Sequence, residues 1–540
     1  MGEYKWEVIN KSKAYDIIDA LLYNRGIKTK KEKKEFFKPR HPDEITLEEY
    51  GIDPVMFEKA IKRIEKALSR KEKIVVFGDY DADGISATAI VWEALYKLGG
   101  NAMPYIPDRF SEGYGMSTSS IDVLFQKYPD LSLLITVDNG ITANEAVSYA
   151  KEKGIDVIVT DHHQPGKKKP KAHSVVHSTK ICGSGVAYVL ANKLVKGNWL
   201  ELAAIGTISD QMPLLSVNRS IVKYGLADLS LTKREGLVAL FKQAGLETAS
   251  INAYHVGFII APRLNAMGRM SNSLDSLRLI CTKDSEKAKS LATILNEMNA
   301  RRQMAVEESY SVAREMVSLD SSGIIAVSHE NFHEGIIGLI ASNLVEEFYR
   351  PSIVISKGKT LSKASARSIV GFNIIESIRK FDHFLVSCGG HPMAAGFTIR
   401  NKDIDKFIDE FNNFAKDFLN DDLLRKTLRV DLEIGFDDIN WELQERIEDF
   451  EPFGLGNPAP SFLTREVCIV EKKVVGKDGK HLKLKLSRDG REYSAIAFGF
   501  GDRKIDEDEN IDLVYGIEKN SWNGHEEIQL NIKDIRASSL

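Results

Sequence analysis

Three short segments of this chain place acidic and imidazole side chains directly behind apolar runs. The segments are VVFGDYDADG, LITVDNG and VIVTDHH, and their polar residues are Asp79, Asp81, Asp83, Asp138, Asp161, His162 and His163. Carboxylate oxygens and imidazole nitrogens are the side-chain atoms that bind divalent cations such as Mn²⁺, with Mg²⁺ favouring the oxygen-richer positions. These residue types therefore predict chemistry that depends on bound cations.

Each segment alone also has a plain structural explanation. Asp83-Gly84 could form a turn and cap a helix, Asp138-Asn139-Gly140 could form a tight turn, and a lone histidine is usually a core or surface residue. Together the segments favour a metal site, because several carboxylates in one crevice repel each other unless cations neutralise them. We expect two divalent ions, with Asp138 on the middle segment bridging them.

The cysteines exclude one class of metal site. The four cysteines are widely spaced and form no CxxC pair, which argues against a structural zinc site. Paired divalent ions stabilise the attacking and leaving oxygens of phosphoryl groups, so hydrolysis of a phosphodiester is the natural reaction. A fourth segment, AAIGTISDQMPL, adds Asp210 as a candidate ligand, although this residue could equally cap a helix or loop.

The elements that must position these side chains form an alternating pattern. From Lys73 to about Leu214, apolar β-like runs alternate with helical stretches, which is typical of βαβ units on a parallel sheet. Near-continuous Val, Ile and Leu in the strands indicate that helices cover both sheet faces. Since the loops after parallel strands meet at one edge, the three segments should converge there.

The rest of the chain predicts further domains. Lys283 to Val317 contains no Gly or Pro and has apolar positions at helical spacing, so it predicts one long helix. A second, smaller α/β block follows, and five short alternating runs after EPFGLGNPAPSF predict an OB-type β-barrel. The predicted boundaries are an N-terminal helical and extended segment at 1–70, a first α/β domain at 71–280, the connecting helix at 281–318, the second α/β domain at 319–425 and the barrel at 426–540.

Composition limits the kinds of partner. With 73 basic and 77 acidic residues the net charge is -4, so any nucleic-acid site must be local. The basic runs at 28–34 and 166–171 would by themselves usually be solvated faces. No segment approaches the roughly 20 apolar residues of a membrane span, and the polar N-terminus resembles no secretion signal. We therefore expect a cytoplasmic protein with no membrane partner.

Seven motifs in order carry a family resemblance. They are GDYDADGISATA, VDNGI, TDHH, ISDQMPL, APRLNAMGRM, HEGIIGLIASNL and GGHPMAAGF. Together they resemble the DHH/DHHA1 phosphoesterase superfamily and, within it, the RecJ family of single-strand-specific exonucleases. The resemblance implies a DHH domain, a DHHA1 domain and an OB-type barrel.

The implied activity is degradation of single-stranded DNA from 5′ to 3′, releasing 5′-mononucleotides, in DNA repair and recombination. The implied cofactors are two Mn²⁺ or Mg²⁺ ions per site, and the implied partners are single-stranded DNA and a single-strand-binding protein or helicase. Two rival functions stay open: a phosphodiesterase for oligoribonucleotides or cyclic dinucleotides, and a non-catalytic replication scaffold.

The resemblance also implies roles for individual residues. The metal ligands would be Asp81, Asp83, Asp138, His162 and Asp210, and further candidates for binding the metals or supporting their ligands would be Asp79, Asp161 and His163. The catalytic set would be Asp81, Asp83, Asp138, His162 and His163. The residues that bind the 5′ end and line the channel would be Arg109, Arg263, Asn265, Arg269, Ser365, Arg367, Gly389, Gly390 and His391.

These substrate-binding assignments fit the chemistry, because a guanidinium pairs bidentately with phosphate and glycines allow close backbone approach. Their alternatives are surface ion pairing for Arg109 and a buried turn for His391. The lysines at 167–171 would lie at the rim of the site and hold phosphates.

In the barrel, aromatic residues could stack on bases or lie in the core; the candidates are Phe462, Tyr493, Phe498 and Phe500. The sequence departs from the family pattern at His177-Ser178, which stand in place of an Asn-Pro element.

Overall fold

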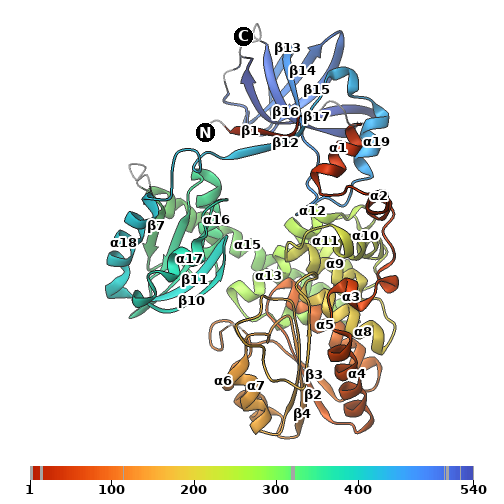
Figure 1. Cartoon of the computed structure of the whole chain (residues 1–540), viewed down its shortest axis with the longest axis vertical. Helices are drawn as coiled ribbons and strands as arrows, with labels where there is room; N and C mark the ends of the chain where they lie inside the picture. The colour runs from red at the N-terminus through yellow and green to blue at the C-terminus, as the bar shows by residue number, and fades with distance from the viewer. Residues whose placement is uncertain are drawn as a thin grey trace. The chain divides into compact units, whose positions relative to one another are not determined.

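The computed structural model describes residues 4–11, 16–113, 115–317, 323–503, 505, 510–522 and 524–538. The chain folds into two compact units (Figure 1). The larger unit comprises residues 6–261, 277–289 and 428–540, and the smaller comprises 1–5, 262–276 and 290–427. The α/β architecture with a C-terminal barrel is as predicted, whereas the five domain boundaries stay predictions.

A five-stranded sheet forms the first half of the larger unit. Its order is β3-β2-β4-β5-β6 and every neighbouring pair is parallel. The strands are β2 (Lys73–Phe77), β3 (Ala102–Tyr105), β4 (Leu131–Val137), β5 (Asp156–Asp161) and β6 (Ser174–His177). β2, β4 and β5 are almost entirely buried, as strands covered on both faces must be.

Helices cover both faces of this sheet (Figure 1). One face packs against α6 (Thr118–Lys127) and α7 (Asn144–Glu152) through a core that includes Val75, Leu134 and Val147. The other carries α5 (Ala82–Lys97) and α8 (Gly183–Leu194), and α9 (Leu200–Ser209) packs against both of these helices. The other helices between residues 17 and 281 are α1 (Ile17–Asn24), α2 (Lys30–Phe37), η1 (Pro42–Glu44), α3 (Leu47–Tyr50), α4 (Pro54–Ser69), α10 (Ser216–Ser230), α11 (Glu235–Gln243), η2 (Thr248–Ser250), α12 (Ala253–His255), the π-helix η3 (Val256–Ile260), α13 (Ala261–Met270) and α14 (Leu274–Cys281). Of these, α13 from Pro262 onward and the start of α14 belong to the smaller unit.

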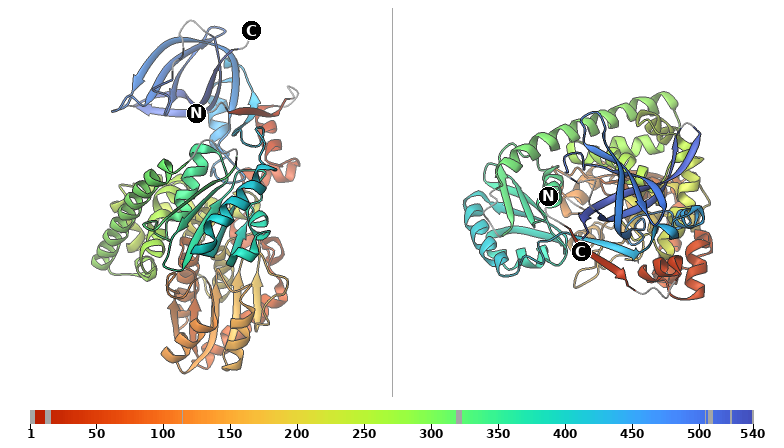
Figure 2. Two further views of the ribbon diagram at one scale, coloured as in Figure 1. Left: turned by 90° about the vertical axis from the view of Figure 1, so that its left-hand side faces the viewer. Right: turned by 90° about the horizontal axis from the view of Figure 1, so that it is seen from above.

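The C-terminal strands close into a barrel (Figure 2). Closure occurs because β13 pairs with both β14 and β16, while β15 and β17 pair in parallel. The elements are β1 (Lys5–Asn10), β12 (Thr427–Glu433), η6 (Phe436–Asp438), α19 (Trp441–Glu448), β13 (Phe462–Val475), β14 (His481–Arg488), β15 (Arg491–Ala497), β16 (Ile511–Trp522) and β17 (His525–Ala537). On β14, Leu482, Leu484 and Leu486 point inward and Lys483 and Lys485 outward, which is the alternation expected of a barrel strand.

A mixed sheet organises the smaller unit. Its order is β10-β11-β9-β8-β7, with one parallel pair, β7 and β8. The elements are β7 (Ile325–His329), α16 (Ile337–Phe348), β8 (Ser352–Ser356), β9 (Leu361–Arg367), α17 (Ile374–Arg379), η4 (Asp382–Phe384), β10 (Leu385–His391), β11 (Ala394–Arg400), η5 (Asn401–Asp403) and α18 (Ile404–Lys416). Phe407 and Phe411 of α18 pack against the sheet and fill its core.

The predicted long helix is α15, which runs without a break from Ser285 to Glu315 over 31 residues (Figure 2). Absence of Gly and Pro allows this continuity, because either residue would interrupt or weaken the hydrogen-bonded turns. None of the helices in the described parts of the chain is both long and apolar enough to cross a bilayer.

Candidate metal centre

Seven acidic and imidazole side chains converge at the carboxyl edge of the parallel sheet. Three overlapping groups have ligand atoms within 4.8 Å of one another: Asp79 with Asp81 and Asp138, Asp83 with His162 and Asp210, and Asp138 with His162 and His163. Asp138 and His162 each belong to two groups. The predicted convergence of the three strand ends is thus present, and Asp210 joins it from the end of α9.

The imidazole of His162 lies near three of the carboxylates. Nε2 of His162 lies 3.1 Å from Oδ1 of Asp138, 3.7 Å from Oδ2 of Asp210 and 4.0 Å from Oδ2 of Asp83. Oδ1 of Asp138 is buried and accepts no hydrogen bond from any described residue. A buried carboxylate oxygen without a partner is costly, and a cation at this point would satisfy it.

The N-terminus of α8 holds Asp83. The backbone N–H groups of Gly183 and Ser184 donate to its two carboxylate oxygens at 2.7 and 2.9 Å. These donors are at the positive end of the helix, which favours a carboxylate. A Cβ on Gly183 would lie 2.4 Å from Cβ of Asp138, and one on Gly206 would lie 2.1 Å from Oδ1 of Asp83. Both glycines therefore make room for ligand side chains.

Asp81 and Asp79 are fixed by the turn that starts α5. Asp81 is the N-cap residue, and its Oδ1 accepts the N–H of Gly84 at 2.9 Å. Oδ1 of Asp79 accepts the N–H of Tyr80 at 2.7 Å. The sequence suggested Asp83 as the helix cap, but Asp81 caps the helix instead. Asp79 and Asp81 each use one carboxylate oxygen in these hydrogen bonds, which leaves the other oxygen for further partners.

Asp161 lies outside the three groups of ligand atoms. Its Oδ1 accepts the N–H groups of His162 and His163 and contacts Nδ1 of His163 at 2.8 Å. Its Oδ2 accepts the N–H of Ile141 at 2.8 Å. Nε2 of His177 donates to the carbonyl oxygen of His163, also at 2.8 Å. Asp161 and His177 therefore position the loop that carries the two histidines.

Burial and mutual repulsion act on the pKa values of these carboxyl groups. Burial, and next the charge of Asp81, raises the pKa of Asp79 well above its usual range. Burial followed by the charge of Asp83 raises the pKa of Asp81 and, more strongly, that of Asp138. The same two causes raise the pKa of Asp210 to about 8. The cluster resists ionisation unless positive charge is added.

The two histidines and Asp161 respond differently. Burial lowers the pKa of His162, which favours the neutral imidazole that binds metals. Burial also acts against protonation of His163, but its hydrogen bond to Asp161 outweighs this and raises the pKa of His163 to about 9. Burial acts against ionisation of Asp161 as well, yet His163 and neighbouring N–H donors lower the pKa of Asp161.

Backbone strain accompanies the site. Asp138 has φ 62° and Gln211, next to Asp210, has φ 54°, both in the left-handed region that non-glycine residues rarely adopt. The N–H of Asp138 donates to the carbonyl of Thr160 at 3.0 Å, which holds this conformation. Such strain persists where the surrounding structure fixes it, often at functional sites. The donor set of carboxylates and one neutral imidazole fits Mn²⁺ or Mg²⁺.

Arg109 is the predicted substrate-binding residue of the larger unit. Its guanidinium lies 5.1 Å from the centre of the Tyr80 ring, beside Asp79, whose pKa it acts to lower. The lysines at 167–171 are exposed on the loop between β5 and β6, and their contact with phosphate stays a prediction.

The other predicted substrate-binding residues belong to the smaller unit. Nη1 of Arg367 donates to Oγ of Ser365 at 3.1 Å, and burial lowers the pKa of Arg367. Nε of Arg263 donates to Asn296 on α15 at 3.0 Å. Arg269 lies within 3.4 Å of the Gly335 carbonyl, and Asn265 lies on α13 with both arginines. His391 is exposed on the β10–β11 hairpin with Gly389 and Gly390, so it is not a buried turn histidine.

The four aromatic candidates of the barrel differ in how deeply they are buried. Phe462 is fully buried in the barrel core, so it cannot stack on a base. Tyr493 and Phe500 are partly buried against the same core. Phe498 is 58% exposed and lies against His481, which leaves it as the surface aromatic of the four.

Some contributors were not predicted from the sequence. Gly183 and Gly206 shape the cluster, and the only sequence signal was the small-residue run CGSG ahead of a helix. Arg302 on α15 has a buried Nε without a partner and donates through Nη2 to Asn299. Arg302 follows Arg301 in a long polar helix, where adjacent arginines carry no distinctive pattern.

Three family models match the chain in order. They are the DHH family N-terminal domain at residues 73–207, the DHHA1 domain at 320–419 and the RecJ OB domain at 430–534. The structure is similar to the crystal structure of RecJ in complex with Mn²⁺ from Thermus thermophilus. The TM-score is 0.86 at 28% identity, covering 99% of this chain and 80% of that one.

Curated relatives extend the match along the whole chain. Single-stranded-DNA-specific exonuclease RecJ of Bacillus subtilis is 36% identical over 97% of this chain and 68% of its own length. The protein of the same name from Haemophilus influenzae is 30% identical over 96% of both chains. Since the family models and these relatives cover the metal centre, the second α/β domain and the barrel together, the chain belongs to the RecJ family.

Proposed function

We propose that this chain is a metal-dependent 5′ to 3′ exonuclease that degrades single-stranded DNA to 5′-mononucleotides in the cytoplasm, in DNA repair and recombination. The observation that carries the proposal is the convergence of Asp138 and His162 with five further ligand-type side chains at one sheet edge. Its support from relatives is that proteins 30–36% identical are named single-stranded-DNA-specific exonucleases.

The residues proposed to hold two Mn²⁺ or Mg²⁺ ions are Asp79, Asp81, Asp83, Asp138, His162 and Asp210. When bound, such ions neutralise phosphate charge and acidify water. The chain itself orients the ligands: α8 fixes Asp83, and Asp161 holds the loop of both histidines. His163, kept protonated by Asp161, is proposed to donate a hydrogen bond to a phosphate oxygen.

Arg367 and Ser365 are proposed to bind the 5′-phosphate, and Arg109 of the larger unit is a further proposed phosphate ligand. Among the described residues no carboxylate forms an ion pair with Arg367, so its charge is available to an anion. A guanidinium and a hydroxyl together provide several donors for phosphate oxygens. Capture of the terminal phosphate would fix the 5′ to 3′ polarity.

The strand beyond the first nucleotide is proposed to contact Arg263, Asn265 and Arg269 of α13 and the hairpin at 389–391. The two glycines of the hairpin are exposed, and Gly389 has open space around it. Because single strands arise by unwinding and are coated in cells, a helicase or a single-strand-binding protein is the proposed partner.

Digestion of end-labelled strands tests the function. The chain is incubated with Mn²⁺ and a 5′-phosphorylated single strand of ~20 nucleotides, labelled at either end, with matched duplex, RNA and dinucleotide substrates. Early release of the 5′ label as a mononucleotide from single-stranded DNA is expected. Earlier loss of the 3′ label, or equal rates on the dinucleotide and the long strand, would contradict the proposal.

A further inference from the structure

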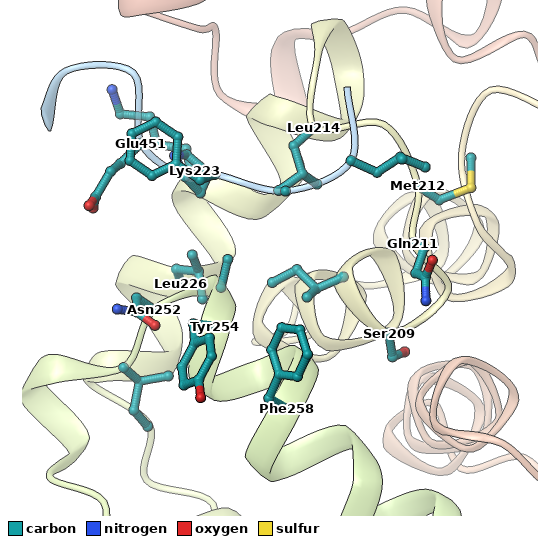
Figure 3. A pocket seen from close by; sticks show the side chains of 18 of the residues that line it. Ser209, Gln211, Met212, Leu214, Lys223, Leu226, Asn252, Tyr254, Phe258 and Glu451 are labelled. Atoms are coloured by element: carbon teal, nitrogen blue, oxygen red, sulfur yellow. The ribbon is translucent and has the colours of Figure 1, made fainter. Parts of the chain in front are cut away.

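A cavity of about 850 Å³ lies within the larger unit (Figure 3). Its walls are segments 208–214, 223–230, 251–258 and 451–459, and we refer to it as the aromatic slot. The volume is within the range of about 300–1,000 Å³ that small-molecule sites occupy. Most of its lining is apolar, so the slot favours a flat, weakly polar group.

One wall presents two stacked rings. Tyr254 and Phe258 have ring centroids 4.9 Å apart and planes inclined by 26°. Their residues are 61% and 71% exposed, and the rings lie side by side across the slot from Leu214 and Glu451 (Figure 3). Aromatic rings exposed beside a cavity are typical of binding sites. Such rings forgo the stabilisation that burial in the core would give, which favours a functional reason for their exposure.

The backbone that carries these rings is unusual. Phe258 belongs to the π-helix η3, and π-turns are frequent at functional sites. Gly257 precedes Phe258 in the sequence, and a Cβ there would contact Ile208 at 3.6 Å. The π-helix thus faces the end of α9 at an ordinary contact distance.

The opposite wall is held firmly. The N–H of Leu214 donates to the carbonyl of Leu455 at 2.7 Å, and a Cβ on Gly454 would lie 2.6 Å from Leu214. The buried guanidinium of Arg219 donates to the carbonyls of residues 449–451 at 2.7 to 3.2 Å. The slot is thus formed in advance of any ligand, which lowers the cost of binding.

Two residues of the slot lining are sequence neighbours of a residue in the metal cluster. Ser209 and Gln211 line it and flank Asp210, whose carboxylate belongs to the metal cluster. The segment at 451–459 leads into β13 of the barrel. Lys223 and Glu451 are the charged residues of the described lining, so the slot suits uncharged bases rather than phosphates.

We propose that the aromatic slot binds nucleobases of a single strand between the metal centre and the barrel, by stacking on Tyr254 and Phe258. The proposal rests on the proposed function and adds a base-binding site to it. Recognition is by ring faces, which all four bases share, so binding is independent of sequence.

Binding to strands with one missing base tests the slot. The full chain carrying Asp138→Ala, which blocks hydrolysis, is titrated with 5′-phosphorylated 3′-fluorescein oligodeoxythymidylates of ~20 nucleotides, each abasic at one position. We expect one or two adjacent abasic positions to weaken binding about tenfold, the factor of one moderate base–aromatic stack. In the same chain with Tyr254→Leu and Phe258→Leu, the intact strand should bind about tenfold more weakly and these positions should lose their effect.

Tyr96→Leu on α5 is the matched control, because Tyr96 is similarly exposed at 64%, and it should leave the abasic pattern unchanged. Tyr254→Phe should retain the pattern too. The abasic positions could weaken binding equally in the Asp138→Ala chain and in the same chain with Tyr254→Leu and Phe258→Leu. If the two proteins also had equal thermal stability, this result would reject the slot as a base-binding site. Hydrolysis of labelled strands by the unmodified chain tests the proposed function separately, so the two failures are distinguishable.

Discussion

Nε2 of His162 and Oδ1 of Asp138 lie 3.1 Å apart, but Asp138 Oδ1 accepts no hydrogen bond from the described residues. Two potential ligand atoms that approach without bonding each other, in a buried site rich in carboxylates, are suited to bind one cation. Repulsion among the carboxylates therefore lowers the free energy of unfolding of the metal-free protein.

Cations should therefore stabilise this chain through Asp138. Adding Mn²⁺ at about 100 times its dissociation constant should stabilise the native state by about 2.7 kcal/mol, visible as a rise in Tm. Asp138→Asn removes a buried charge, so its metal-free form should melt at a higher temperature than metal-free wild type, while Mn²⁺ raises its Tm much less. Scanning fluorimetry with EDTA or Mn²⁺ measures both. Equal Mn²⁺ shifts in the two proteins would contradict the ligand role.

Gly183→Ala should lower hydrolysis by about 100-fold, because a Cβ 2.4 Å from Cβ of Asp138 displaces that carboxylate and small misplacements at reacting centres are costly. The rate of mononucleotide release from a 5′-phosphorylated strand gives the effect. Gly166→Ala is the matched control, since its Cβ would meet nothing closer than 4.0 Å, and it should keep full activity. Full activity of both variants would show that α8 can shift without cost.

His177→Ala should weaken Mn²⁺ binding by about tenfold, since it removes the donor that fixes the carbonyl of His163 and groups behind metal ligands commonly contribute this much. Isothermal titration with Mn²⁺ measures this independently of hydrolysis. His177→Asn keeps a donor and should recover part of the affinity. Unchanged affinity in the alanine variant would exclude a positioning role.

Arg367→Gln should selectively slow digestion of 5′-phosphorylated strands, because the charge that would pair with the terminal phosphate is removed while hydrogen-bonding capacity remains. The ratio of kcat/KM for phosphorylated and hydroxyl-ended strands should fall about tenfold toward unity. Arg400→Gln, an exposed position on β11, controls for general loss of charge. An unchanged ratio would place the end-binding group elsewhere.

Arg219→Met should reduce the free energy of unfolding by about 3 kcal/mol, because the buried guanidinium donates to four backbone carbonyls that would lose their partner. Burial, and next the charge of Arg25, lowers the pKa of Arg219 to about 10. Urea unfolding followed by tryptophan fluorescence gives the change. Lys485→Met, which removes an exposed ion pair on the barrel, should change stability by less than about 1 kcal/mol.

The parts predicted correctly from the sequence follow local rules. The convergence of Asp81, Asp138 and His162 follows from the parallel-sheet pattern, because the ends of parallel strands share an edge. The long helix α15 follows from an uninterrupted run without Gly or Pro. Alternation along β14 predicts a barrel strand in the same way.

What the residues alone left open depends on contacts between distant segments. From its own segment Asp210 could be a ligand or a cap, because it ends a helix, where a negative charge is locally unfavourable; its neighbours in space favour the ligand. Phe462 was a candidate for stacking, but alternation alone does not tell which face of a strand lies inside a barrel. The role of Gly183 requires knowing what a missing side chain would have touched.

The absence of a side chain at Gly183 suggests how inactive members of a family with this metal centre can be recognised. A descendant sequence could retain every aspartate and histidine of the cluster and still lose catalysis through one methyl group at position 183 or 206. A check of the ligand residues alone would classify such a sequence as active. The absence of a Cβ atom at positions 183 and 206 would then be what distinguishes an active nuclease from an inactive relative.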